Sequence, residues 1–156
     1  IQVRMLADGR AVSELGEVVV GPAEVVDAGE PVALTTASVG NPHAVVRLDG
    51  AGRDDLLRLG PLLEAHERFP RRTNVQLVEP LSLHHLRVLV WERGAGETSS
   101  SGSSSAAAAA VAVARGWCES PVTVHLPGGE LEVSFAGGNA TLTGPAAQLD
   151  RGETDI

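Results

Sequence analysis

Residues 91–110, WERGAGETSSSGSSSAAAAA, join the end of a predicted strand to the start of a predicted helix. The β-branched and apolar run 86–91 predicts the strand, and the alanine run that begins at Ala106 predicts the helix. Glycine and serine fill the turn between them, so a ligand can approach the backbone closely. The first N–H groups of a helix have no partner within it, and the helix dipole favours negative charge there. The stretch therefore predicts a site for a carboxylate or a phosphate.

The same letters have a simpler interpretation, a flexible linker. SSSGSSS (residues 99–105) has the composition of such linkers, and polyalanine alone is a weak indicator of structure. The flanking residues favour the structured interpretation. Glu92 and Arg93 form a charged pair at the end of the strand, and Glu97 and Thr98 stand in the turn, where a linker does not need them.

Composition limits the partners and the location. A chain of 156 residues is long enough for one domain with a substantial core. Its net charge of −8 and its lack of a basic cluster argue against nucleic acid and anionic membranes as partners. No window approaches the roughly 18 apolar residues of a membrane span, and no signal-peptide pattern is seen. With one cysteine and so no internal disulfide, we expect a cytoplasmic protein.

Composition also limits the cofactors. All twelve basic residues are arginine, so no lysine of this chain can form a Schiff base with pyridoxal phosphate. The histidines outside the GNPH motif (residues 40–43) show no metal-ligand spacing with a carboxylate or thiol partner. We therefore expect no cofactor and no metal.

The pattern of the whole chain predicts an α+β domain of about nine or ten strands and two helices. We expect strands at residues 2–6, 11–15, 18–20, 32–39, 44–48, 73–79, 85–91, 122–126, 131–135 and 141–143, with further strand in the tail. One helix should start at Asp54 as its N-cap and run to about His66, with a kink or restart at Pro61. The other should run over residues 102–115 and stop at Gly116. Its alanine surface lets strands pack on every side of it.

Four motifs occur in a recognisable order: GNPHAVV (40–46), RTNVQLVE (72–79), WERGAGET (91–98) and LPGGELEV (126–133). Together they resemble the C-terminal half of a diaminopimelate epimerase, the cofactor-independent enzyme that interconverts the LL and meso forms of diaminopimelate for lysine and peptidoglycan precursors. The resemblance implies a mixed, mostly antiparallel sheet rolled around a central helix at about residues 102–115.

The same resemblance implies how this domain would be completed. It makes residues 1–156 a single domain, the C-terminal half of a two-domain protein whose N-terminal half is absent from this sequence. This expectation fits a first residue, Ile1, already inside an alternating strand. The expected partners are a small amino-acid substrate and either that half or a second copy of the chain.

The resemblance also implies a set of site residues. The family removes and replaces an α-proton with two cysteines, each at the start of its half's helix, and the cysteine position of this half is Ser101. Gly102 and Ser103 match the positions that hold the substrate's α-carboxylate. By resemblance the catalytic residues are Ser101, His43 and Glu92, and the substrate-binding residues are Asn41, Asn74, Glu92, Arg93, Gly102 and Ser103.

Ser101 creates a chemical difficulty. A helix N-terminus can make a thiol with an ordinary pKa of about 8.5 a usable base. A serine hydroxyl is a far weaker acid, and a dipole contribution of about 0.3–1 kcal/mol does not close that gap. Ser101 could still donate a proton, or be activated by a neighbour such as Glu92. Three explanations stay open: a deliberate replacement of cysteine, a natural variant with altered chemistry, and an inactive homologue.

Each matched residue also has an ordinary structural interpretation. Asn41 with Pro42 could be a plain turn, His43 a hydrogen-bonded histidine at a strand edge, and Asn74 a cap. Glu92 and Arg93 could form a solvated ion pair of little energetic value. Cys118 follows the second helix and is predicted to be a half-buried structural thiol. The functional alternatives are therefore a dehydratase of a β-hydroxy amino acid, or an amino-acid-binding homologue without catalysis.

Overall fold

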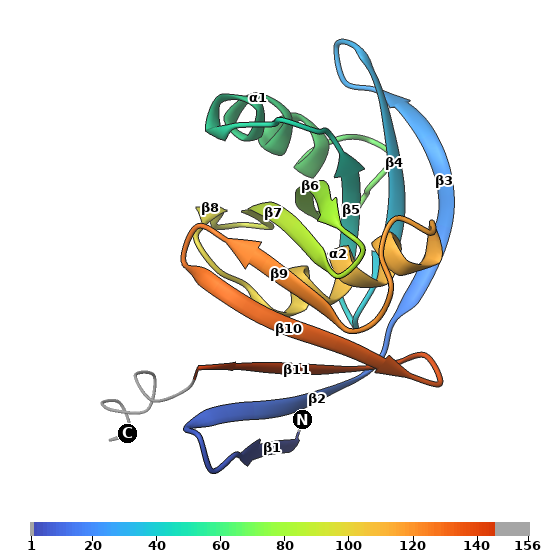
Figure 1. Ribbon diagram of the computed structural model, residues 1–156. Coiled ribbons are helices and arrows are strands. Elements are labelled where there is room, and N and C mark those ends of the chain that lie inside the picture. Colours follow the sequence, from blue (N-terminus) through green and yellow to red (C-terminus); the bar gives the residue numbers. More distant parts are fainter. Residues whose placement is uncertain (1, 146–156) are drawn as a thin grey trace, which may run out of the picture.

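One mixed sheet of eleven strands and two helices account for the regular structure of the computed structural model, which describes residues 2–145 (Figure 1). The first five strands are β1 (Gln2–Met5), β2 (Arg10–Glu17), β3 (Val19–Asp27), β4 (Pro31–Ser38) and β5 (Pro42–Arg47). Helix α1 (Arg53–Glu64) leads to β6 (Asn74–Ser82), β7 (His85–Glu92) and β8 (Gly96–Thr98). Helix α2 (Gly102–Ala114) precedes β9 (Val122–Leu126), β10 (Gly129–Ala136) and β11 (Asn139–Pro145). The predicted α+β class is confirmed.

The order of strands across the sheet is β1-β2-β11-β10-β9-β7-β6-β5-β4-β3, and β8 pairs with β7. Among the strands that the structure describes, two neighbouring pairs are parallel, β5 with β6 and β7 with β9, and the others are antiparallel. A parallel pair needs a long crossover connection, which usually contains a helix. The two helices lie in these two connections, α1 between β5 and β6 and α2 between β7 and β9. The sheet is therefore mixed and mostly antiparallel, as the family resemblance implied.

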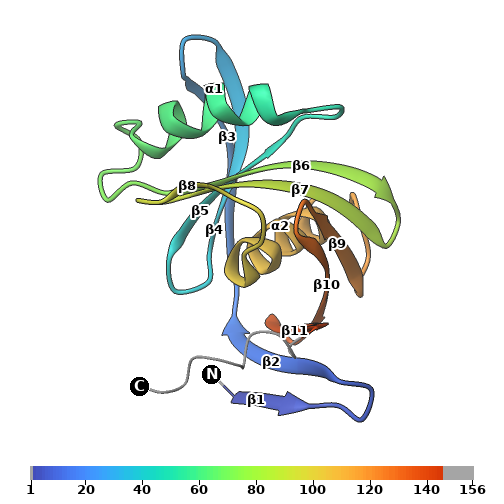
Figure 2. The same cartoon turned by 90° about the vertical axis from the view of Figure 1, so that its left-hand side faces the viewer.

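The two helices lie on opposite faces of β6 and β7 (Figure 2). Alternate residues of these strands supply two separate apolar cores, because successive side chains of a strand point to opposite faces. Val75, Leu77 and Leu89 pack in the core that contains the leucines of α1. Val78, Val88 and Val90 pack in the core that contains α2. Residue 76, which lies between Val75 and Leu77, consequently faces α2.

Helix α2 is almost completely buried. Its alanines 106–109 have no exposed surface, and Ser104 and Ser105 are buried as well. The helix contacts β3, β4, β5, β6 and β7 on one part of the sheet and β9, β10 and β11 on the other. Side chains no larger than valine allow this close approach. The predicted span of 102–115 is confirmed, with Arg115 as the C-cap and Gly116 at φ 79° beyond it.

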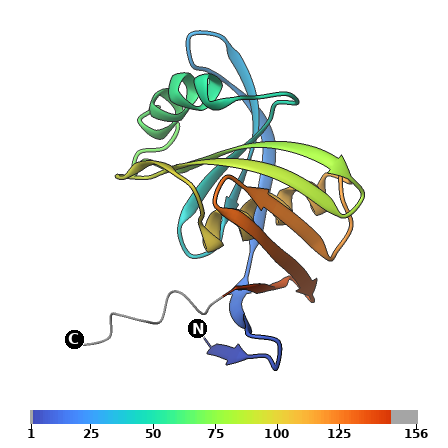
Figure 3. The ribbon, with the colours of Figure 1, turned by 60° about the vertical axis from the view of Figure 1, so that its left-hand side comes forward.

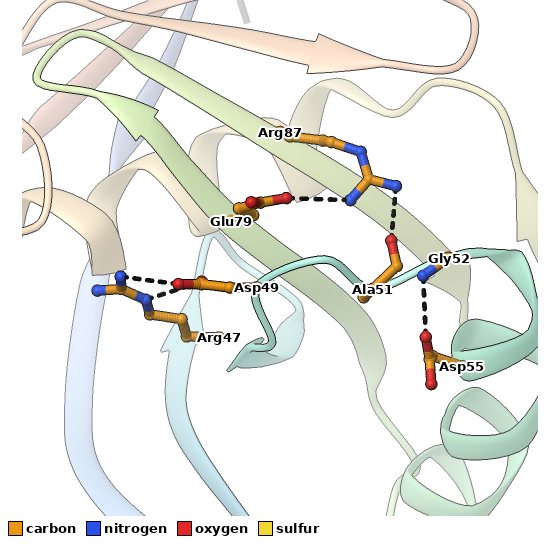
Figure 4. Close-up of polar contacts among 7 residues, drawn as sticks. All are labelled: Arg47, Asp49, Ala51, Gly52, Asp55, Glu79 and Arg87. Carbon is orange, nitrogen blue, oxygen red and sulfur yellow. Dashed lines mark hydrogen bonds and ion pairs between the residues drawn. The ribbon is translucent and has the colours of Figure 1, made fainter.

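Helix α1 differs at both ends from the sequence prediction. Its N-cap is Gly52 and not Asp54, because the Asp55 carboxylate accepts the Gly52 N–H at 2.9 Å (Figure 4). Nearby, Arg87 donates to the Ala51 carbonyl at 2.6 Å and so holds the loop before the helix. The helix ends at Glu64 and not at His66, and Pro61 lies inside it without ending it.

Two further segments were predicted incompletely. The strand predicted at residues 18–20 continues to Asp27, because a register shift between Val20 and Ala23 carries the chain past Gly21 and Pro22. Residues 96–98, predicted as turn, form the short strand β8 against the end of β7. The predicted hairpin at Asp8 and Gly9 is present, and it lies at the end of the molecule away from α1 (Figure 3). The predicted strand in the tail lies outside the described residues.

No helix within residues 2–145 has the length and apolar character needed to cross a bilayer.

Candidate functional site

Asn74 connects two of the sequence motifs, GNPH and the segment that follows β7, at the start of β6. In the parallel pair β5–β6, His43 lies beside Asn74, and in the next pair Val75 lies beside Trp91. The Asn74 side-chain amide donates to the Pro42 carbonyl at 3.0 Å and accepts the Arg93 N–H at 2.8 Å. The amide thus ties the Asn41–Pro42 turn to the segment that leaves β7, and it is itself only 4% exposed.

His43 is buried, with 1% of its surface exposed, and both ring nitrogens have partners. Nε2 lies 3.1 Å from Asn41 Oδ1, and Nδ1 lies 2.8 Å from the side-chain nitrogen of Gln76. Burial, with a smaller contribution from the positive charge of Arg93, lowers the pKa of His43 from 6.5 to about 4. The ring is therefore neutral near pH 7, because the buried surroundings do not solvate a charged imidazolium.

Ser101 is the N-cap of α2, in extended conformation. Its hydroxyl oxygen accepts the Ser104 N–H at 3.2 Å, and its carbonyl accepts the Ser105 hydroxyl at 2.7 Å. Gly102 and Ser103, the first two helical residues, have no acceptor for their backbone N–H groups among the described residues. The predicted bare helix start is present, and its dipole favours a negatively charged ligand there.

A polar chain joins the helix start to the GNPH motif. The Gln76 side chain donates to Ser104 Oγ at 2.9 Å as well as to His43. Asn41, His43, Gln76 and Ser104 therefore form a continuous set of hydrogen bonds from the surface turn to the first turn of α2. Gln76 was not among the predicted site residues. A polar residue between Val75 and Leu77, inside the apolar run 75–78, was the available signal.

Glu92 is the last residue of β7 and Arg93 follows it, but the two side chains do not pair with each other in the described structure. The Arg93 guanidinium donates to the Arg71 carbonyl at 3.4 Å, and the Glu92 carboxylate makes no ion pair or hydrogen bond with the described residues, Ser101 included. Both side chains have solvent access. The two residues thus offer one negative and one positive group beside Asn74.

A second acidic residue that sequence analysis missed, Glu64, holds this turn. Its carboxylate accepts the Trp91 indole N–H at 2.9 Å and the Gly94 N–H at 2.7 Å, and it pairs with Arg72 at 3.1 Å. Burial opposes its ionisation, but the two hydrogen bonds and Arg72 outweigh burial and lower the pKa of Glu64. The available signal was a charge on the apolar stripe of α1.

The LPGG turn supports the loop that enters α2. Gly128 donates its N–H to the Ser99 carbonyl at 2.8 Å. A Cβ at Gly128 would lie 2.9 Å from that carbonyl oxygen, so no larger residue fits without a shift. The fourth motif therefore contacts the residue that directly follows the third motif, just before the start of the helix.

A cavity of about 480 Å³ lies beside this cluster. Asn41 and His43 line it, together with residues 68–72 and parts of β3 and β4. Asn74, Glu92, Arg93 and the start of α2 do not line it.

Within residues 2–145, no group of three or more His, Cys, Asp or Glu side chains could hold a metal ion. Cys118 is 2% exposed, more buried than predicted, and burial raises its pKa.

Solved structures define the class of the fold. A hydroxyproline epimerase from Agrobacterium vitis superposes with a TM-score of 0.65 at 17% identity, over 88% of this chain and 50% of that one. A phenazine biosynthesis protein of the PhzF family from Bacillus anthracis gives 0.65 at 12% identity, over 93% and 61%. This chain therefore has a fold found in epimerases and in the PhzF family.

Sequence comparison identifies the family within this class. A family model described as diaminopimelate epimerase matches residues 35–149. The diaminopimelate epimerase of Ectopseudomonas mendocina is 41% identical over all of this chain and 62% of that protein. That of Stutzerimonas stutzeri is 42% identical over 82% of this chain and 47% of that protein. This chain belongs to the diaminopimelate epimerase family, and it spans about half to three fifths of these relatives.

Proposed function

We propose that this chain forms one half of the active-site cleft of a diaminopimelate epimerase that works without a cofactor. The observation that carries the proposal is the start of α2 after the motif GET, where two backbone N–H groups have no acceptor among the described residues. Ser104, in the first turn of this helix, is linked by hydrogen bonds to Gln76 and through it to the GNPH motif. In this proposal the second half comes from a segment beyond these 156 residues or from a second copy of the chain. Residues 1–156 then act as one domain.

The proposed arrangement follows that of the family. The sheet rolls around α2 as a central helix, an arrangement supported by the contacts of α2 with eight of the strands. The helix start then opens toward the second half, so the substrate is held between them. The cytoplasm is the proposed compartment, since lysine and peptidoglycan precursors are made there.

Racemisation requires removal of a proton from the carbon next to a carboxylate, which puts negative charge on that carboxylate in the transition state. The N–H groups of Gly102 and Ser103 would bind the α-carboxylate, and the helix dipole would stabilise the added charge. Asn41, Asn74, Glu92 and Arg93 would contact the other polar groups of the substrate. His43 is neutral near pH 7 and uses both ring nitrogens within the protein, so it would act on the substrate indirectly, through the Asn41 side chain that it holds.

Ser101 stands at the position of the proton-transferring group. Its oxygen accepts the Ser104 N–H, which leaves the hydroxyl hydrogen free to donate. We propose that Ser101 acts as an acid or hydrogen-bond donor, and that the base comes from the second half. A thiol at this position would act as a base far more readily, because its pKa is several units lower.

The test is exchange of the α-proton of LL-diaminopimelate in heavy water, measured by NMR and mass spectrometry in the full-length protein. We expect Ser101→Cys to raise the exchange rate at least about tenfold, while Ser100→Cys, one residue away, leaves the rate unchanged. No exchange and no inversion by either the unmodified protein or the Ser101→Cys variant would overturn the epimerase proposal. Release of a keto product from β-hydroxy amino acids, without inversion of diaminopimelate, would favour a dehydratase.

A second proposal is an amino-acid-binding protein without catalysis. It is supported by the use of the Ser101 hydroxyl as a helix cap, a purely structural role that requires no proton transfer. Binding of LL-diaminopimelate by calorimetry, together with no turnover in the unmodified protein and none in Ser101→Cys, would support it.

A further inference from the structure

Gln76 is the most completely buried polar side chain among those that join the GNPH motif to α2. It has no exposed surface and lies between Val45 of β5 and Val90 of β7 in the sheet. Burying an amide in such apolar surroundings costs free energy unless hydrogen bonds replace those to water. Gln76 makes two hydrogen bonds that offset this cost, one to His43 and one to Ser104.

The hydrogen bonds of Gln76 specify where the proton of His43 lies. An amide nitrogen carries two hydrogens and can only donate, so at 2.8 Å the Nδ1 atom of His43 must accept. The second hydrogen goes to Ser104 Oγ at 2.9 Å. The neutral ring then carries its hydrogen on Nε2, which donates to Asn41 Oδ1 at 3.1 Å.

The reverse orientation of the Gln76 amide is less favourable. In the described orientation one buried atom, the amide oxygen Oε1, has no partner. Reversal would put the two N–H groups in that place, and buried N–H donors without an acceptor are rarer in proteins than carbonyl oxygens without a donor. The hydrogen-bond geometry therefore favours the orientation in which Gln76 donates.

The orientation of Asn41 follows from the proton on His43. Because Asn41 Oδ1 accepts from His43, its Nδ2 group, which has no acceptor among the described residues, points away from the ring. Asn41 lines the cavity beside the cluster, so this donor is available to a ligand. A carboxylate accepts such a donor, whereas the amide oxygen in its place would repel a carboxylate.

We propose that Gln76 is a positioning residue that holds His43 as the Nε2–H tautomer and thereby presents the Asn41 amide N–H₂ to a carboxylate ligand. Through Ser104 the same side chain fixes the distance between this donor and the first turn of α2. The identity of the ligand rests on the proposed function, but the tautomer of His43 does not.

The first test is the His43 tautomer itself, read from two-bond ¹H–¹⁵N correlation spectra of the ring near pH 7. We expect Nε2–H in the unmodified protein and a mixture of the two tautomers in Gln76→Met, which keeps the length of the side chain without its donor. Val78→Ala, two residues along the same face of β6, is the matched control and should keep Nε2–H although it opens the core. An Nδ1–H ring in the unmodified protein, or an unchanged ring in Gln76→Met, overturns the proposal.

The second test separates this proposal from the proposed function. Calorimetry should show that Gln76→Met weakens binding of LL-diaminopimelate by about fivefold to tenfold, the effect of one lost or misdirected hydrogen bond. In an Asn41→Ala background the same substitution should have no further effect, because both act through one donor. Independent effects of the two substitutions overturn the proposal. Absence of binding by the unmodified protein overturns the proposed function and leaves the tautomer test decisive.

Discussion

The two helices cover opposite faces of the same two strands, yet they are built in different ways. Helix α1 has one buried stripe, with Leu56, Leu59 and Leu63 inside, and it leaves Leu57 and Leu62 partly exposed. Helix α2 is buried from Ser104 to Ala112 and carries no residue larger than valine. The two helices contribute to the candidate site in different ways. Helix α2 contributes the backbone N–H groups at its own start, whereas α1 fixes the turn after β7 through the Glu64 side chain.

Each face also contains one buried titratable side chain of the cluster. His43 lies on the side of α2 and is kept neutral by burial, whereas Glu64 lies on the side of α1 and is kept charged by its donors. The free energy of unfolding should therefore change differently when side-chain volume, pH or hydrogen bonds are altered on the two faces.

The largest effect should come from added volume in α2. Ala108→Leu puts three more carbon atoms where no space is exposed, so we expect a loss of about 3 kcal/mol in the free energy of unfolding. Ala65→Leu, the same change at the exposed end of α1, should stay within about 0.5 kcal/mol. Urea unfolding of both variants checks the comparison, and equal losses would show that the two helices are packed alike.

The next effect is a loss of stability at low pH, caused by the buried His43 on the α2 side of the sheet. The pKa of His43 is about 4 in the folded protein against 6.5 ordinarily, a difference that corresponds to roughly 3 kcal/mol. The unfolded chain binds the proton first, so the free energy of unfolding should fall as the pH drops from 6.5 toward 4. His43→Gln should remove most of this decline. A free energy of unfolding that is unchanged between pH 7 and pH 4.5 would contradict the assignment.

Loss of the Glu64 charge should cost somewhat less, in a different pH range. Glu64→Gln weakens two hydrogen bonds to a carboxylate and one ion pair, so we expect a loss of about 2 kcal/mol at pH 7. Because the folded pKa of Glu64 lies below 4.5, its contribution is complete above that value and disappears as the pH falls through the folded pKa. Urea titrations at pH 7 and pH 3 should show the difference between the two proteins shrinking. A constant difference would mean that the carboxylate charge contributes little.

The smallest effect belongs to the cap of α2. Ser101→Ala removes the acceptor for the Ser104 N–H and should lower the free energy of unfolding by about 1 kcal/mol. Ser100→Ala, whose hydroxyl has no partner among the described residues, is the control and should have almost no effect. A loss much below that of a typical cap would show that packing around α2, and not its first hydrogen bond, holds the start of the helix in place.

Much of the fold could be predicted because short-range patterns specify it. The β-branched and apolar run of β7 and the alanine run of α2 give a strand and a helix, and the four motifs identify the family. The start of α1 was predicted two residues too late, because the Asp55 carboxylate accepts the Gly52 N–H and makes Gly52 the cap. The continuation of β3 past Pro22 depends on a register shift against β4, which its own sequence does not reveal.

In the candidate site, too, some features could be predicted from the sequence and others could not. The sequence by itself determined which residue types are present: the amides Asn41 and Asn74, the small residues at the start of α2, and serine at position 101. Only the tertiary structure decided that Gln76 and Glu64 belong with them, because the groups that hydrogen-bond to both side chains lie at least 27 residues away in the chain. Local sequence encodes backbone preference and the chemistry of each side chain, whereas hydrogen bonds between distant strands and helices exist only once the sheet has formed.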